Sequence, residues 1–258
     1  EDACTIIICL RKRVEQADGI TWGPLSRREQ RQMDEVRRLW KGAAEQGFAQ
    51  AQYNLGVMYE MGHGVNQNYK KAFRCYEMAA EQGSITSQCT LGRMYDNGLG
   101  VDQSQKKAVE WWEKAAEQGF VQAQICLAAL YAQGQGVNKN YKKAIEWFEK
   151  AAKQGEAHAQ YNLGYMYRNG QGVDVNYKKA IEWYEKAAEQ GHTVAQYNLG
   201  VMYHHGVGVD PSDSEAMRWF AKAAAQGHEG AQDKIDTILA KRRSSSSSSA
   251  AGASREDK

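Results

Sequence analysis

"NYKKAIEWFEKAAKQG" at residues 140–155 and "NYKKAIEWYEKAAEQG" at residues 176–191 decide the fold, because they differ at only two positions and start 36 residues apart. The Gln-Gly pair that ends each stretch recurs at the same interval from residue 46 to residue 227. A fixed period of this length is typical of supersecondary units that stack, because one unit alone cannot bury its apolar face. The sequence therefore predicts an array of 36-residue repeats.

The period divides most of the chain into five full repeats between two half-repeats. Residues 26–47 match the second half of a repeat and are predicted to be an N-terminal capping half-repeat, and residues 228–243 are predicted to be a C-terminal capping helix. We expect residues 1–25 to be poorly ordered and the low-complexity, serine-rich residues 244–258 to be disordered. The full repeats are repeat 1 (48–83), repeat 2 (84–119), repeat 3 (120–155), repeat 4 (156–191) and repeat 5 (192–227).

Each repeat is predicted to hold two helices, and its residues are numbered here as positions 1 to 36. Positions 4–14 form the first helix, and a Gly-x-Gly-Val turn follows, in which glycine supplies left-handed backbone conformations. The second helix has apolar residues at i, i+3, i+4 and i+7 spacing. Position 21 holds good helix N-cap residues: Asn68, Ser104, Asn140, Asn176 and Ser212. Tryptophans of the second helices are predicted to pack in the core: Trp111, Trp112, Trp147, Trp183 and Trp219.

The composition is that of a folded globular protein, with 42% hydrophobic residues, 25% charged residues and a net charge of +2. The longest apolar run, residues 3–10, is far shorter than the roughly 20 residues that a membrane-spanning helix needs. Five cysteines without a Cys-x-x-Cys pair argue against a disulfide framework and a structural zinc site. We therefore expect no cofactor, no membrane insertion of the array, and an intracellular, cytoplasmic protein whose N-terminus looks truncated.

Two motifs of the repeat resemble the Sel-one-like repeat (SLR) family, a relative of the tetratricopeptide repeats. They are Leu-Gly-x-x-Tyr-x-x-Gly-x-Gly-Val and Lys-Ala-x-x-Trp-x-x-Lys-Ala-Ala-x-x-Gly, and they cover residues 48–227. The resemblance implies an all-α fold, a right-handed α/α superhelix whose first helices line a concave groove. It also implies a non-enzymatic adaptor or scaffold that binds a protein or peptide partner in that groove.

The candidate binding residues come from a comparison of the repeats with one another. Positions 4, 5, 8, 9, 11, 12 and 15 hardly vary and form one arc of the first helix, as stacking requires, whereas positions 3, 6, 10, 13 and 14 vary and form the opposite arc. Asparagines at position 7 either bind a peptide backbone or tie neighbouring repeats together. Position 13 changes from acidic to basic along the chain, so we expect the partner to bind in one direction. The predicted partner-binding residues are Tyr53, Asn54, Glu60, Arg93, Asp96, Tyr161, Asn162, Tyr165, Arg168, Tyr197, Asn198 and His204.

Two other functions are alternatives to the protein-binding adaptor. Ser104 and Lys107 have the Ser-x-x-Lys spacing of penicillin-recognising hydrolases, an activity linked to cysteine-rich SLR proteins, but the Ser-Asp-Asn and Lys-Thr-Gly partners are missing and an N-cap role explains Ser104 better. A helical-repeat RNA binder would need a basic track, whereas residues 48–240 carry slightly more acidic than basic side chains. We therefore expect no nucleic-acid partner. Ser245 follows two arginines and is a candidate phosphorylation site.

Overall fold

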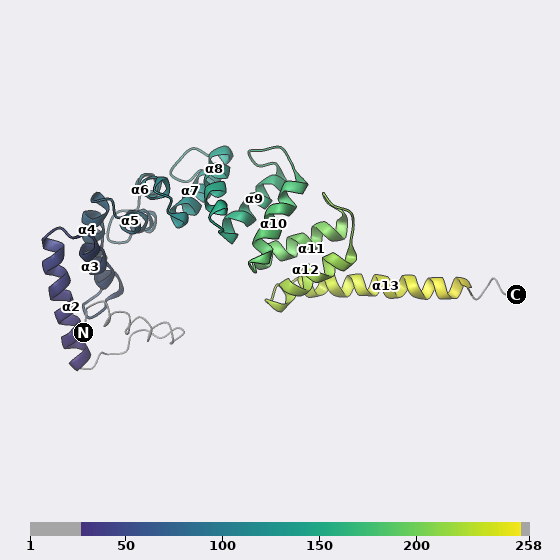
Figure 1. Ribbon diagram of the computed structural model, residues 1–258, viewed down its shortest axis with the longest axis horizontal. Helices are drawn as coiled ribbons and strands as arrows, with labels where there is room; N and C mark the ends of the chain where they lie inside the picture. Colours follow the sequence, from purple (N-terminus) through teal and green to yellow (C-terminus); the bar gives the residue numbers. More distant parts are fainter. Residues whose placement is uncertain (1–26, 254–258) are drawn as a thin grey trace. The chain divides into compact units, whose positions relative to one another are not determined.

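The computed structural model describes residues 27–253, with side chains as far as residue 243, and this range forms twelve α-helices and no strand (Figure 1). The all-α class and the 36-residue helix-turn-helix repeat are therefore confirmed. The expectation for residues 1–25 lies outside the described residues. The chain divides into two compact units, residues 1–120 and residues 121–258.

The first unit contains the N-terminal half-repeat followed by repeats 1 and 2. Its first helix packs on the next through a small apolar cluster, in which Met33 and Val36 contact Met58. The order along the chain is therefore one capping helix and then two helix pairs. The helices are α2 (Arg27–Glu45), α3 (Ala49–Met61), α4 (Tyr69–Glu81), α5 (Ile85–Asn97) and α6 (Gln105–Glu117).

The second unit contains repeats 3, 4 and 5 and a last, longer helix. A cluster of buried residues joins the second helix of repeat 4 to both helices of repeat 5, with Tyr184, Leu199 and Trp219 among its members. Repeats 4 and 5 thus share buried core residues, as the repeat period predicts. The helices are α7 (Val121–Gln133), α8 (Tyr141–Lys153), α9 (Ala157–Asn169), α10 (Tyr177–Glu189), α11 (Thr193–His205), α12 (Asp213–Ala225) and α13 (Ala231–Ala253).

The ends of the helices follow the local signals of the sequence. At every second helix of the five repeats, the position-21 side chain accepts a hydrogen bond from the backbone N–H three residues later, which confirms the predicted N-caps. The first helices α3, α5, α9 and α11 end at a glycine in the left-handed conformation, such as Gly170 with φ of 66°. Residues with a Cβ rarely adopt this conformation, so the Gly-x-Gly turn has a structural cause.

The core is centred on an aromatic residue at position 29 of the second helix. This residue is buried in all five repeats, and in the four repeats that have glycine at position 9 of the first helix its ring lies against that glycine. A Cβ added to Gly164 would lie only 2.6 Å from the ring of Tyr184, so the missing side chain lets the ring approach the backbone. The position-29 residues are Tyr76, Trp112, Phe148, Tyr184 and Phe220.

The prediction that the tryptophans pack in the core is correct only in part. Trp112 and Trp219 are buried, but Trp111, Trp147 and Trp183 are half-exposed at position 28. Position 28 lies one residue, about 100° around the helix, from the buried position 29. A lysine three residues later covers each half-exposed ring, with the Nζ atom 3.9, 3.7 and 4.3 Å from the three ring centroids.

The last helix, α13, carries the apolar stripe expected of a C-terminal cap. Ala231 and Ile238 are buried, and Ile238 belongs to a cluster with Phe220 of α12. The helix continues to residue 253 and so includes ten residues of the segment for which we expected disorder, because serine costs a helix only about half a kcal/mol relative to alanine. Phosphorylation of Ser245, whose side chain lies outside the described part, stays a prediction.

Candidate binding surface

The predicted binding residues lie on one side of the first helices. Positions 6, 10 and 13 are spaced by four and three residues and therefore share a side of the helix, with position 7 at its edge. We call these four positions of α3, α5, α7, α9 and α11 the first-helix face. The opposite side is packed, since Leu163 and Met166 of α9 are buried.

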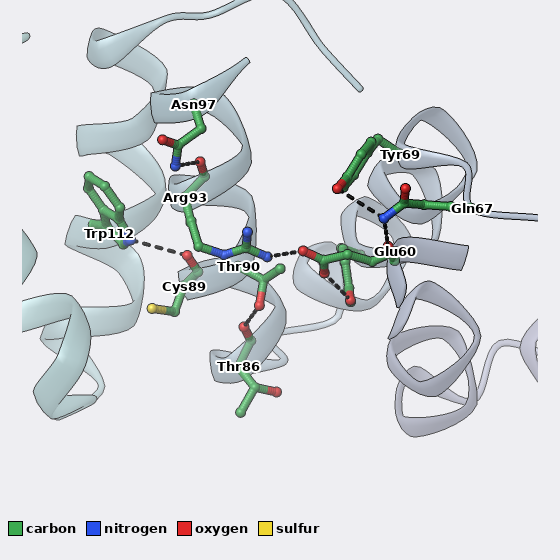
Figure 2. Close-up of polar contacts among 10 residues, drawn as sticks. Glu60, Gln67, Tyr69, Thr86, Cys89, Thr90, Arg93, Asn97 and Trp112 are labelled. Atoms are coloured by element: carbon green, nitrogen blue, oxygen red, sulfur yellow. Dashed lines mark hydrogen bonds and ion pairs between the residues drawn. The ribbon is translucent and has the colours of Figure 1, made fainter. Parts of the chain in front are cut away.

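In the first unit, the most acidic part of this face is already occupied. Glu60 of α3 is only 6% exposed, and its carboxylate accepts a hydrogen bond of 2.7 Å from the buried hydroxyl of Tyr76. Arg93 of α5 pairs with the other oxygen of the same carboxylate (Figure 2). Burial, followed by the negative charge of Glu60, raises the pKa of Tyr76 well above its usual value. Glu60 and Arg93 therefore join repeat 1 to repeat 2.

The other predicted residues of the first unit lie at the edge of this buried group. Tyr53 packs on Tyr76 with ring centroids 5.5 Å apart. Asn54 accepts a hydrogen bond of 3.1 Å from Gln50 within the same helix. Asp96 is half-exposed. Asp96 is therefore the acidic side chain of this face that remains within reach of solvent.

In the second unit, α9 presents aromatic rings beside an arginine. Tyr161 packs on Tyr184 at 5.8 Å and stacks on the imidazole of His192 at 4.6 Å. Tyr165, one turn further along, is 41% exposed. Arg168 follows after three residues and is half-exposed. The face of α9 therefore combines a packed tyrosine, a solvent-exposed tyrosine and a guanidinium.

The asparagines of position 7 differ in their contacts. Asn162 donates a hydrogen bond of 2.8 Å to the carbonyl of His158 in its own helix. Burial raises the pKa of Tyr161 and Tyr184 in repeat 4, and the amide of Asn198 of α11 partly opposes this rise at both, so Asn198 lies towards repeat 4. Of the two roles predicted for position 7, a link between repeats therefore fits Asn198, whereas Asn162 satisfies its amide locally.

Tyr184 of α10 has an unusual hydroxyl group. The side chain is fully buried, yet its oxygen has no hydrogen-bond partner within the described chain. Burial raises the pKa of Tyr184 to about 12, while the neighbouring guanidinium of Arg168 and amide of Asn198 oppose the rise. Neither neighbour makes a hydrogen bond of normal geometry with the hydroxyl. Buried polar groups of this kind are rare in folded proteins and call for an explanation.

The face of α11 is mostly engaged within its own unit. Tyr197 stacks on His228 at 4.2 Å and packs on Phe220 at 5.5 Å. His204 contacts the carboxylate of Asp213, the first residue of α12, at 2.7 Å. Thus two of the charged residues at position 13, Glu60 and His204, have partners inside the fold. The expected change of charge along position 13 reaches solvent only through Asp96 and Arg168.

A row of glutamines has a role that sequence reasoning missed. Gln160 at position 5 donates a hydrogen bond of 3.3 Å to the carbonyl of Ala152 in the preceding repeat. The same side chain accepts a bond of 2.8 Å from Gln190 at position 35 of its own repeat. The position-5 glutamines are buried, and their pairs with position 35 recur in all five repeats. Their strict spacing of 30 residues was the signal available in the sequence.

The structure gives no support to a catalytic or metal site at the residues considered. The hydroxyl of Ser104 accepts the backbone N–H of Lys107 as an N-cap, and the ammonium of Lys107 lies 5.2 Å from the centre of the Tyr95 ring. Over residues 27–253, no three His, Cys, Asp or Glu side chains are grouped to hold a metal ion. Among the helices described, none has the length and apolar character to cross a membrane.

The fold and this surface define an all-α repeat protein built from stacked two-helix units. Its repeats match the family model of the Sel1 repeat at residues 49–84, 85–120, 121–156, 157–192 and 193–228, one residue later than the Gln-Gly division. The chain belongs to the Sel1 repeat family, as the sequence motifs predicted. Proteins of this family are generally scaffolds for protein interaction rather than enzymes. No curated protein matches the chain.

Several solved structures share the fold, and two of them illustrate the likeness. One is c5321, a protective antigen of uropathogenic Escherichia coli strains that displays an SLR fold, with a TM-score of 0.76 and 38% identity. The match covers 78% of this chain and 43% of that one, so this chain spans less than half the length of the antigen. The other is a Sel1 repeat protein from Oxalobacter formigenes, with a TM-score of 0.73, 29% identity and coverage of 92% and 87%.

Proposed function

We propose that this chain is a non-enzymatic scaffold that binds a protein or peptide through the first-helix face, with α9 and α11 making the central contacts. The observation that carries this proposal is Tyr165, which is 41% exposed on a helix whose opposite side is packed. Tyr165 stands between Tyr161 and Arg168 on the same side of α9. The proposal thus rests on an exposed aromatic residue held on a rigid element.

The residue types of this surface favour protein recognition. Tyrosine and arginine are enriched at the energetic centres of interfaces. The tyrosine ring buries a large area and loses little conformational freedom on binding. Arg168 is half-exposed and makes no ion pair with another described residue. It remains able to attract an acidic partner, which affects the association rate more than the affinity.

The contacts within the first-helix face change how strongly each residue is expected to contribute to the proposed interface. Glu60 and His204 have partners within the fold and contribute to the stacked repeats, so we place them at the margin of the proposed interface. Arg93 is tied to Glu60 but is still partly exposed. The strongest candidates are Tyr165, which is exposed, and Arg168, which is half-exposed. Tyr161, Tyr197 and Asn198 are half-exposed but have contacts within the fold, so they rank next.

The test is an affinity purification from cell extract with the full chain as bait, followed by identification and measured binding of the captured protein. Tyr165→Ala is expected to weaken binding by about 2 kcal/mol or more if Tyr165 is an anchor. Arg168→Glu is expected to slow association. Lys178→Glu, at an exposed residue of α10, is the control and is expected to leave binding unchanged. If the control loses the partner while both first-helix variants keep it, the proposed face is wrong.

A further inference from the structure

The polar groups at position 29 are satisfied in every repeat except repeat 4. The hydroxyl of Tyr76 donates to Glu60 at 2.7 Å, and the indole N–H of Trp112 donates to the carbonyl of Cys89 at 3.1 Å (Figure 2). Phe148 and Phe220 have no polar atom to satisfy. Tyr184 alone has a buried hydroxyl without an acceptor. The phenylalanines demonstrate that packing at this position does not require a hydroxyl group.

Repeat 1 reveals which group is missing in repeat 4. There, the carboxylate of Glu60 reaches the tyrosine hydroxyl from position 13, and the guanidinium of Arg93 neutralises the carboxylate. In repeat 4, position 13 is Arg168. The tyrosine and the arginine are thus present beside each other, but the carboxylate that would bind both is absent.

We propose that Tyr184 and Arg168 form a subsite for a carboxylate, which an aspartate or glutamate side chain of the bound peptide supplies. This inference rests on the proposed function and names the chemistry of the partner at one point of the first-helix face. The carboxylate has the bridging role that Glu60 has in repeat 1, between a tyrosine hydroxyl and a guanidinium. One of its oxygens accepts the hydroxyl hydrogen of Tyr184, and the other pairs with Arg168.

The surroundings of Tyr184 are suited to this ligand. Arg168 and Asn198 are the neighbours that act on the pKa of this hydroxyl, and both side chains are half-exposed. The ring of Tyr161 closes one side, with its centroid 5.8 Å from that of Tyr184. A carboxylate held by a phenol and a guanidinium makes charge-assisted hydrogen bonds, which are about twice as strong as neutral ones. Asn198 adds a further amide donor.

The first experiment separates the carboxylate from the peptide that carries it. A display library of random dodecapeptides is selected on the full chain, and only peptides that lose binding to Tyr165→Ala are kept. Each is then made with acetylated and amidated ends, so that no terminal carboxylate remains. We expect each to contain an Asp or Glu whose change to Asn or Gln weakens binding on the order of tenfold or more in calorimetry.

The second experiment removes the hydroxyl without disturbing the core. Tyr184→Phe is expected to keep or raise the melting temperature, because phenylalanine fills this position in repeats 3 and 5 and the unsatisfied group disappears. The same variant is expected to lose most of the preference for the acidic peptide over its amide analogue. Tyr76→Phe is the matched control. It is expected to lower the melting temperature, because Glu60 loses its donor, and to leave that preference unchanged.

A third variant supplies the missing carboxylate within the chain. Arg168→Glu with Val201→Arg rebuilds in repeats 4 and 5 the arrangement of Glu60, Tyr76 and Arg93, and is expected to raise the melting temperature and abolish acidic-peptide binding. Selected peptides that tolerate Asn or Gln, or a preference that survives Tyr184→Phe, overturn the carboxylate subsite and leave the scaffold function standing. A library that yields no peptide sensitive to Tyr165→Ala overturns both.

Discussion

Glycine at position 9 of the first helix has a hydrogen atom where alanine has a methyl group. This difference sets how closely the two helices of a repeat approach each other. Gly164 faces the ring of Tyr184, and a Cβ at this residue would lie 2.6 Å from the ring, well inside van der Waals contact. Tyr184 is fully buried, so its ring has little room to yield. Repeat 3 has Ala128 opposite Phe148 instead, so each repeat has its own fit between these two positions.

Gly164→Ala is therefore expected to lower the free energy of unfolding by about 1–3 kcal/mol, because overpacking displaces a buried ring. The measurement is denaturant unfolding followed by circular dichroism. Gly42→Ala is the control, since nothing lies within 4 Å of a Cβ at this position inside α2. It is expected to raise stability by roughly 0.5–1 kcal/mol, because alanine is the better helix former. Equal effects of the two variants would contradict this account.

The structural role of a residue could be predicted from the sequence where it depends on neighbouring residues in the chain. It could not be predicted where it depends on contacts between repeats. Asn68 was identified as an N-cap because a cap depends on the next three residues. The pairing of Glu60 with Arg93 was missed, because it joins variable positions of two repeats and no other repeat pair carries the same combination. Trp147 was placed in the core because positions 28 and 29 both fit the apolar pattern, and only packing distinguishes them. The orphan hydroxyl of Tyr184 likewise required coordinates.

At the scale of the helices, the glutamine pairs attach each first helix to the end of the helix before it. The last carbonyl groups of a helix lack partners within the helix. The carbonyl of Ala152 at the end of α8 accepts the backbone N–H of Gly155, and the side chain of Gln160 adds a second hydrogen bond to it. Gln160 is itself bound by Gln190 beyond the end of α10. One side chain thus connects three helices of repeats 3 and 4.

Gln160→Leu is expected to lower the free energy of unfolding by about 1–3 kcal/mol, because it removes two hydrogen bonds of a buried side chain, each worth about 0.5–1.5 kcal/mol. Chemical denaturation measures the change. Gln122→Leu, at an exposed residue of α7, provides the comparison and is expected to change stability by no more than about 0.5 kcal/mol. A Gln160 variant as stable as the Gln122 variant would refute the role of the pairs.

The start of α11 introduces a dependence on pH. The Nδ1 atom of His192 accepts a hydrogen bond of 3.2 Å from the backbone N–H of Ala195, so this nitrogen carries no proton in the capped helix. Burial, and then the nearby His158, lowers the pKa of His192 below its ordinary value of about 6.5. The folded state therefore favours the neutral imidazole, and its contribution to stability is complete above about pH 6.5.

We expect the melting temperature to fall as the pH drops below about 6.5 towards the folded pKa of His192, because the unfolded chain takes up the proton first. His192→Ser is expected to make this fall shallower. Serine preserves the cap, as Ser84 does at the same position of repeat 2. Part of the fall in melting temperature is expected to remain in His192→Ser, because burial also lowers the pKa of His63. Identical pH profiles for the wild type and His192→Ser would contradict the assignment.

At the scale of the whole molecule, the apolar side of a terminal repeat must be buried by a capping helix. Phe220 and Ala216 of α12 are fully buried, and they form one cluster with Ile238 of α13. The period of the sequence predicted this arrangement, because a repeat without a neighbour leaves its apolar side open. The length of α13 was not predictable in the same way, since the serine run carries no apolar pattern that would define a helix end.

A chain that ends at residue 227 is therefore expected to melt at a lower temperature and to aggregate, since it exposes the apolar surface of α12. A chain that ends at residue 243 keeps the buried part of α13 and is expected to melt like the full chain. Thermal unfolding and size-exclusion chromatography with light scattering distinguish the two truncations. Monodisperse behaviour and an unchanged melting temperature of the shorter chain would disprove the capping role.

The ion pair of Glu60 and Arg93 limits how this protein can be recombined. The two residues lie in different repeats, and position 10 is Ala129, Tyr165 and Val201 in repeats 3, 4 and 5. If repeat 1 were transplanted in front of any of these, Glu60 would lose its counter-charge while remaining buried, and an uncompensated buried charge destabilises the fold. The exchangeable module is then the 72-residue pair of repeats 1 and 2, and a designer who lengthens the array should copy residues 48–119 as one block.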